Sequence, residues 1–156
     1  TPDYLYDFFS ELYGIPTDRR DARKRMLFAR FGIQKFAQVR VRDLSTGMKQ
    51  KVSLVISLVQ DPEIIIFDEP TNGLDILTAK VVTDFLLDLK EQGKTIIVST
   101  HIFSLVEKIC DRVGIIINGR MAACEDLWTL CGDQSLEDRF FEIYEAVNGE
   151  EENHDK

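Results

Sequence analysis

The sequence contains few of the residues that cross-link or interrupt small folds. Its 156 residues include three cysteines, four prolines, one tryptophan and two histidines. Cys110, Cys124 and Cys131 form no Cys-x-x-Cys pair, and their low number excludes a disulfide scaffold. They indicate reduced, structural cysteines of a cytosolic protein.

A long apolar segment is also missing. The longest apolar stretch, residues 52–67, is interrupted by polar and helix-breaking residues at 60–63. It therefore falls short of the roughly 20 residues that a membrane-spanning helix needs. The chain starts at Thr1 without a basic-then-apolar leader. This start predicts a piece of a longer protein that is not secreted.

Basic residues are in deficit. The chain has 27 acidic and 19 basic side chains, so its net charge is −8 at neutral pH. This balance excludes nucleic-acid binding driven by net positive charge, and no nucleic-acid partner is expected. The composition is 44% hydrophobic and 29% charged, which predicts a globular domain with a core rather than a disordered or fibrous chain.

The first third of the chain predicts helices. Apolar residues recur at helical spacing from residue 3 until Gly14 and Pro16 end the run, and a charged segment leads into a second helix that Gly32 ends. Residues 1–42 are therefore expected to be helical throughout. A third helix is predicted to begin at Ser45 and Thr46, since these residue types are preferred as N-caps.

Strands and helices alternate in the middle of the sequence. Residues 64–67 are wholly apolar and rich in β-branched side chains, which is typical of a strand buried on both faces in a parallel sheet. Asp75 can cap a helix that continues to Gly93, and residues 95–99 predict a second buried strand. The alternation predicts an α/β fold.

The last third predicts a hairpin and further helices. Residues 113–117 and 120–123 flank Asn118-Gly119, which is a two-residue turn signal. Helices are predicted at 102–109, 125–130 and 136–147. The acidic residues 148–156 predict a disordered tail.

Two acidic residues follow the first predicted strand. Asp68 and Glu69 lie at its carboxyl end, the edge at which open α/β sheets bind ligands. A carboxylate at that position costs desolvation free energy unless it meets a cation or water. Asp68 is therefore predicted to hold Mg²⁺, and Glu69 to polarise a water that attacks a phosphate. Two solvated acids at a strand end are the simpler alternative.

Two further segments are candidates for phosphate contact. The helix start at Ser45-Thr46-Gly47 offers backbone N–H groups, a hydroxyl and the positive end of the helix dipole. An ordinary N-cap is the alternative. His101 follows the second predicted strand and could reach the same phosphate, whereas a capping or surface histidine is the commoner case.

Taken in their order along the chain, these motifs resemble the C-terminal portion of an ABC-type ATPase. Residues 44–48 resemble the signature loop of that family, and residues 64–68 resemble its Walker B strand. Glu69 is similar to its catalytic glutamate. Residues 70–75 resemble the D-loop, and residues 99–101 resemble the segment that carries the switch histidine.

The resemblance implies roles for these residues. Glu69 and His101 would be catalytic, and Asp68 would hold Mg²⁺. The remaining candidates would contact ATP. They are Ser45, Thr46, Gly47 and Asp75.

The resemblance also implies an architecture and partners. The fold would be the C-terminal part of a P-loop NTPase with a helical subdomain at 1–60, a partial parallel sheet in the ATP-binding core at 61–147, and the tail at 148–156. A transmembrane permease subunit and a second nucleotide-binding domain in a head-to-tail dimer would be the partners, at the cytoplasmic, inner face of the cell membrane. Residues 135–140 resemble the C-terminal helix of multidrug, antibiotic and ion exporters with separate ATPase subunits.

The sequence departs from the family pattern in the signature loop and by one absence. Thr46 stands where the family usually has glycine, and Met48 stands where it usually has glutamine. No Gly-x-x-x-x-Gly-Lys-Ser/Thr motif occurs in the 156 residues, so the loop that cradles the β- and γ-phosphates is missing. The chain alone is therefore expected to be inactive, and truncation is a better explanation than degeneration.

Two other classes of protein compete with this interpretation. The C-terminal lobe of an SMC-type DNA-repair ATPase also lacks the phosphate loop, but it should open with a long coiled coil, and residues 1–40 show no sustained heptads. A non-catalytic interaction module that kept the fold is the third possibility. It is disfavoured because Asp68, Glu69, Asp75 and His101 are all present.

Overall fold

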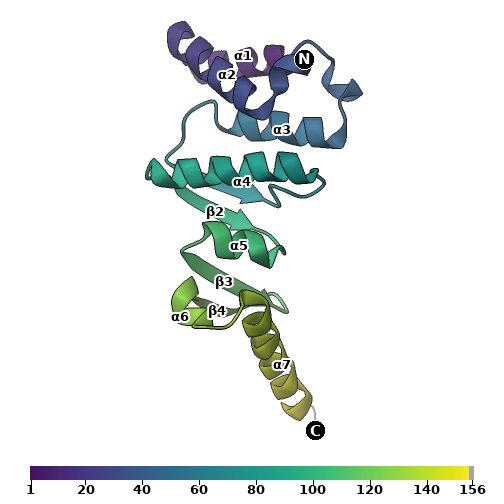
Figure 1. Cartoon of the computed structure of the whole chain (residues 1–156), viewed down its shortest axis with the longest axis vertical. Coiled ribbons are helices and arrows are strands. Elements are labelled where there is room, and N and C mark those ends of the chain that lie inside the picture. Colours follow the sequence, from purple (N-terminus) through teal and green to yellow (C-terminus); the bar gives the residue numbers. More distant parts are fainter. Residues whose placement is uncertain (155–156) are drawn as a thin grey trace. The chain divides into compact units, whose positions relative to one another are not determined.

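The computed structural model describes residues 1–154 and confirms the α/β class (Figure 1). It divides into two compact units, Thr1–Ser99 and the residues from Thr100 onward. The first contains α1 (Pro2–Leu12), α2 (Thr17–Phe31), η1 (Ile33–Phe36), η2 (Val41–Asp43), α3 (Thr46–Ser57), β1 (Ile64–Asp68), α4 (Ile76–Glu91) and β2 (Thr95–Ser99). The second contains α5 (Phe103–Ile109), β3 (Arg112–Ile117), β4 (Arg120–Asp126), α6 (Leu127–Cys131) and α7 (Leu136–His154).

Helical and strand-containing segments pack together in the first unit. Helix α4 packs against α2, since the rings of Phe31 and Phe85 make an edge contact with centroids 5.1 Å apart. Arg30 of α2 forms an ion pair with Asp88 of α4. These contacts join the helical segment to the strand-containing segment, so residues on both sides of position 60 belong to one unit.

The first two helices begin and end near the predicted residues. The Thr1 hydroxyl accepts a hydrogen bond from the backbone N–H of Tyr4 and so caps α1, and Gly32 ends α2 in the left-handed conformation at φ 66°. Residues 33–43 contain two short 3₁₀ helices rather than a continuation of α-helix.

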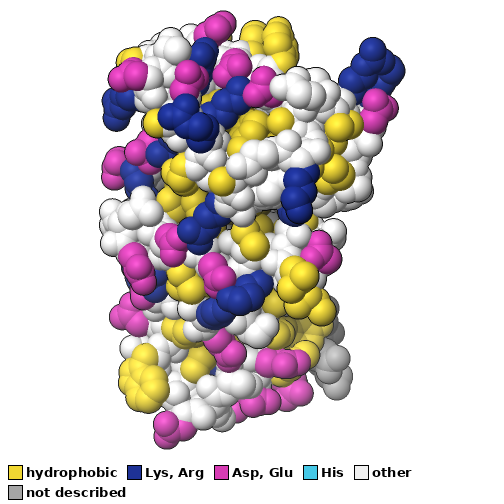
Figure 2. Space-filling view, turned by 45° about the horizontal axis from the view of Figure 1, so that its top comes forward, with side chains coloured by type: hydrophobic (Ala, Val, Ile, Leu, Met, Phe, Trp, Pro, Cys, Tyr) yellow, Lys and Arg dark blue, Asp and Glu magenta, His cyan; other side chains and the backbone are white. Residues whose placement is uncertain are grey.

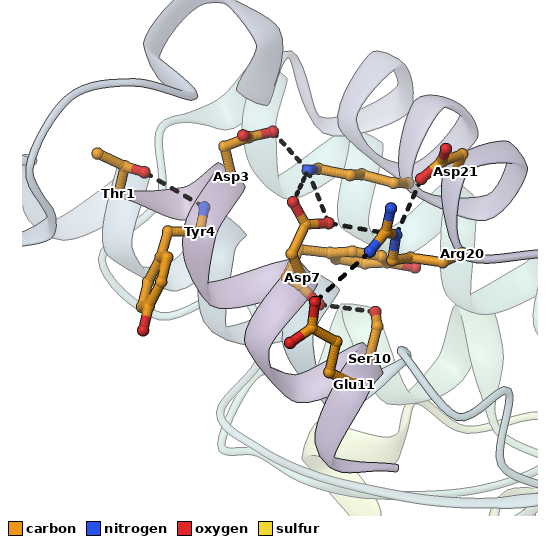
Figure 3. Close-up of polar contacts among 10 residues, drawn as sticks. Thr1, Asp3, Tyr4, Asp7, Ser10, Glu11, Arg20 and Asp21 are labelled. Carbon is orange, nitrogen blue, oxygen red and sulfur yellow. Dashed lines mark hydrogen bonds and ion pairs between the residues drawn. The ribbon is translucent and has the colours of Figure 1, made fainter. Parts of the chain in front are cut away.

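Ion pairs connect α1 to α2 (Figure 3). The Lys24 ammonium donates to both carboxylate oxygens of Asp7 at 3.0 Å and also pairs with Asp3. Arg20 lies 3.5 Å from Asp7 and bonds to Asp21 at 2.9 Å. The acidic residues of α1 therefore face cations of α2, and Figure 2 shows basic side chains beside acidic ones over the face drawn.

Strands β1 and β2 pair in parallel, in the register Ile64 with Thr95 through Asp68 with Ser99. One face of the sheet packs inward and includes Ile65 and Phe67, which are buried. The opposite face is exposed, at 63% for Ile64, 72% for Ile66 and 54% for Ile97. The prediction that the strand is buried on both faces is therefore wrong for this chain, because the residues of the first unit leave its second face exposed.

The second unit contains the predicted hairpin. β3 and β4 are antiparallel, and the turn residues Asn118 and Gly119 both have positive φ, 51° and 74°, which suits a two-residue hairpin turn. β4 extends to Asp126, so the helix predicted from Glu125 begins instead at Leu127. The strand continues because pairing with Val113 and Arg112 persists to its end.

Helix α7 also differs from its predicted length. It continues to His154 through residues predicted to form a disordered tail, because each further residue adds a backbone hydrogen bond to a helix that has already begun. The prediction for residues 155–156 lies outside the described residues. None of the helices within residues 1–154 combines the length and apolar character that crossing a bilayer requires.

Candidate functional site

The acidic pair lies at the carboxyl end of β1, as the sequence predicts. Asp68 is the last strand residue and is exposed, whereas Glu69 is half-buried and has a left-handed backbone at φ 45°. This conformation is costly for a residue with a Cβ. The Glu69 N–H donates to the Ser99 carbonyl at 2.9 Å, and the Glu69 carbonyl accepts from the Asn72 N–H at 3.1 Å. These two bonds fix the turn that follows the strand.

Asp68 has a partner that the sequence analysis missed. The Ser99 hydroxyl donates a hydrogen bond to Oδ1 of Asp68, its opposite residue in the parallel register. The sequence holds a signal for this contact, since Asp68 directly follows the first predicted strand and Ser99 ends the second. A parallel register that aligns their ends would have placed the two side chains together.

The start of α3 has the predicted cap. The Ser45 Oγ accepts a hydrogen bond from the Met48 N–H at 3.3 Å. Ser45 and Thr46 are both exposed at this helix N-terminus. Because the hydroxyl accepts in this bond, its own proton can still be donated to an oxygen of a ligand.

Gly47 is not required by the fold. It has no positive φ, and a Cβ built there would lie 3.6 Å from Leu74 Cδ2, which is ordinary van der Waals contact. A glycine within the first turn of a helix destabilises it relative to alanine. The packing of this chain therefore does not account for a glycine at this position.

The loop after β1 passes the start of α3. A Cβ built on Gly73, which has φ 70°, would lie 3.9 Å from Cγ2 of Thr46. The loop ends at Asp75, whose carboxylate caps α4 by accepting from the Thr78 N–H at 3.0 Å and the Thr78 hydroxyl at 2.7 Å. The hydrogen bonds from Thr78 lower the pKa of Asp75, and Lys51 adds to this shift. Both Asp75 oxygens are thus engaged within the chain.

The residues of the first unit fit part of a magnesium and phosphate site. Mg²⁺ keeps several waters and binds one or two carboxylates together with substrate phosphates, so the exposed Asp68 carboxylate suits it. Within residues 1–154 there is no group of three or more His, Cys, Asp and Glu side chains that could hold a metal alone. His101 belongs to the second unit and its side chain is exposed.

Comparison with known proteins finds similarity to one family. Residues 6–72 match the family model described as ABC transporter, and this range contains Asp68, Glu69 and the helix start at 45–47. The chain is 39% identical over 131 residues to the ABC transporter ATP-binding protein NatA of Bacillus subtilis, covering 84% of this chain and 53% of NatA. It is 36% identical over 118 residues to a fluoroquinolones export ATP-binding protein of Mycobacterium tuberculosis, covering 76% and 38% of the two chains.

Solved structures agree with these relatives. An ATP-binding subunit of an ABC transporter superposes with a TM-score of 0.85 at 28% identity, over 92% of this chain and 62% of that one. The cbiO1 protein of Clostridium perfringens, described as part of the ABC transporter complex cbiONQ, matches with a TM-score of 0.63 at 30% identity, over 80% of this chain and 51% of that one.

The fold and the order of the motifs are those of an ABC-type ATP-binding domain. The chain is similar to ATP-binding proteins of the ABC transporter family. It spans about half the length of the curated relatives that it matches.

Proposed function

We propose that this chain forms part of an ATP-hydrolysing subunit that powers the transport of a substrate across a membrane. The observation that carries the proposal is the acidic pair at the carboxyl end of β1, where Glu69 is held in a left-handed turn beside Asp68. A strained backbone at the ligand-binding edge of a parallel sheet is typical of a functional residue.

Glu69 acts as the general base in this proposal. Its carboxylate accepts a hydrogen bond from the attacking water and polarises it toward the γ-phosphate of ATP. Asp68 holds Mg²⁺, directly or through a water. A Mg²⁺ ion bound there would supply positive charge that neutralises the phosphate oxygens. His101 donates to the γ-phosphate as charge develops on its oxygens.

The start of α3 serves a second nucleotide. The Ser45 hydroxyl and the Gly47 N–H bind the γ-phosphate of ATP held by an opposite subunit in a head-to-tail dimer, and the exposed Thr46 lines that contact. Asp75 shapes the same interface by fixing the start of α4, because its carboxylate is bonded to Thr78.

The partners follow from the family. A transmembrane permease subunit binds the helical part of the chain, α1 to α3, at the inner face of the cell membrane. Relatives named for fluoroquinolone export and Nod factor export support export as the direction of transport. In this proposal the 156-residue chain alone is inactive, because its sequence contains no Gly-x-x-x-x-Gly-Lys-Ser/Thr loop.

The proposal is tested in a hybrid protein. In this NatA hybrid, the matching region of the present chain replaces the 131 aligned residues of NatA. Glu69→Gln in the hybrid should abolish steady-state ATP hydrolysis and leave ATP binding intact, because the water loses its base while the contacts to ATP remain. Hydrolysis of near-normal rate in the Glu69→Gln hybrid would remove the general-base role. ATP binding by the variant serves as the control for folding.

A further inference from the structure

Ser99 contacts both residues of the acidic pair with different groups. Its hydroxyl donates to Oδ1 of Asp68, while its backbone carbonyl accepts from the N–H of Glu69 at 2.9 Å. Ser99 is the last residue of β2, directly opposite Asp68 in the parallel register. One residue of the neighbouring strand therefore holds the end of β1 and the first residue of the turn.

We propose that Ser99 is a positioning residue that fixes the side-chain rotamer of Asp68 for metal binding. This inference rests on the proposed function, in which Asp68 holds Mg²⁺, and goes beyond it by assigning a role to Ser99. In this role the side chain of Ser99 contacts neither the attacking water, the nucleotide nor the metal. It acts through Asp68.

The position of Asp68 explains why its side chain needs a partner. Successive side chains of a strand point to opposite faces, so Asp68 shares the exposed sheet face with Ile64 and Ile66. An exposed side chain at a strand end samples several χ1 rotamers. A hydrogen bond from a neutral hydroxyl to a carboxylate is strong enough to favour one of them. Ordering the carboxylate in advance strengthens metal binding, since less rotamer entropy is lost.

The two bonds of Ser99 can be separated experimentally. The backbone bond to Glu69 survives any substitution that keeps β2 in place, whereas the bond to Asp68 needs a hydroxyl. Ser99→Thr keeps a hydroxyl. Ser99→Val introduces a side chain of almost the same shape as threonine but without the hydroxyl. Thr95 lies on the same strand but opposite Ile64, so Thr95→Val is a matched control for the loss of a hydroxyl.

The first test measures the Asp68 rotamer in the 156-residue chain, with neither metal nor nucleotide. Three-bond NMR couplings should report one dominant χ1 for Asp68 in the wild type, in Ser99→Thr and in Thr95→Val. They should report averaged couplings in Ser99→Val. Urea unfolding of the four proteins should differ little, because Ser99 is exposed. An unchanged Asp68 coupling in Ser99→Val would overturn the inference.

The second test measures the metal dependence of the NatA hybrid. The Mg²⁺ concentration for half-maximal hydrolysis should rise about tenfold in Ser99→Val, as expected for loss of one hydrogen bond to a charged group, and return in Ser99→Thr. If Ser99→Val showed averaged couplings but an unchanged Mg²⁺ dependence, the rotamer of Asp68 would not matter for metal binding. That result would also overturn the inference. Failure of the proposed function is seen separately, as hydrolysis that persists in Glu69→Gln.

Discussion

At the scale of single residues, Glu69 has a backbone conformation that lowers the stability of the fold. Its φ of 45° lies in the left-handed region, which costs a non-glycine residue about 1 kcal/mol or more. A glycine would adopt this conformation without strain. The presence of a glutamate at this turn therefore indicates that the carboxylate is needed there for a reason other than folding.

Glu69→Gly should separate stability from activity. We expect the free energy of unfolding of the chain to stay the same or to rise by up to about 1 kcal/mol, because relief of strain offsets the greater flexibility of the unfolded chain. Urea denaturation measures this change. Asp68→Gly, in the extended end of β1, should instead lower the free energy of unfolding by about 1 kcal/mol. Equal destabilisation by both changes would contradict the strain assigned to Glu69.

Tyr6 offers a second test at this scale. Its side chain is fully buried, and its hydroxyl has no hydrogen-bond partner among the residues that the structure describes. Burial raises the pKa of Tyr6 to about 12. Tyr6→Phe should raise the free energy of unfolding at pH 7 by about 1 kcal/mol, because an unpaired buried hydroxyl is removed and the ring contact with Phe28 is kept.

The pH dependence of Tyr6→Phe tests the burial of Tyr6. The folded-state pKa of Tyr6 exceeds the unfolded value of 10, so the unfolded chain ionises first. The stability that Tyr6 contributes is present below pH 10 and declines as the pH rises toward 12. The advantage of Tyr6→Phe over the wild type in urea should therefore grow between pH 9 and pH 11. A constant difference would show that Tyr6 is not buried as described.

At the scale of elements, the first turn of α3 contains a glycine that packing does not require. Gly47→Ala should raise the free energy of unfolding by about 0.5 to 1 kcal/mol, because alanine favours the helix and its Cβ meets only ordinary contacts. The same change should reduce ATP hydrolysis by the NatA hybrid, since the Cβ occupies the space proposed for a phosphate.

A glycine that the fold does require is the control for Gly47. Gly93, with φ 81°, ends the turn after α4, so Gly93→Ala should destabilise the chain in the same urea experiment. If Gly47→Ala were destabilising to the same extent, packing rather than a ligand would explain Gly47.

Elements with local signals were predictable from the sequence. The caps at Ser45 and Asp75 and the turn at Asn118-Gly119 are confirmed, because each depends on residues within four positions of one another. The exposed second face of β1 and the Ser99–Asp68 bond were missed. Both depend on which segments lie beside the strand, and periodicity within a strand holds no such information.

The candidate site was predictable in part for the same reason. Asp68 and Glu69 stand at the predicted end of β1, since an apolar run that stops at charged residues marks the edge of a sheet. The left-handed φ of Glu69 was not foreseen, because glutamate is not a residue type that signals such a turn. The roles of Ser45, Thr46 and Gly47 toward a nucleotide stay predictions.

At the scale of the whole molecule, the absent phosphate loop limits what the chain can do alone. The 156-residue chain should not bind Mg-ATP with micromolar affinity, about −8 kcal/mol, because the loop that holds the β- and γ-phosphates is missing from its sequence. Isothermal titration calorimetry measures this affinity. Micromolar binding by the chain alone would show that other residues hold the nucleotide.

The central claim is that each chain contributes Glu69 to the hydrolysis of one ATP and Ser45 to the binding of the ATP held by its partner. Two variants of the NatA hybrid test it, Glu69→Gln and Ser45→Arg, each of which should be inactive by itself. In a mixed dimer both lesions fall on one site, and the other site is intact.

The deciding measurement is the rate of ATP hydrolysis in an equal mixture of these two variants. With random pairing and independent sites, half of the dimers are mixed and each has one of two sites intact, so about a quarter of the wild-type rate should return. If Ser45 and Glu69 instead served the same ATP, both sites of a mixed dimer would be damaged. A mixture as inactive as its two components would then contradict the account.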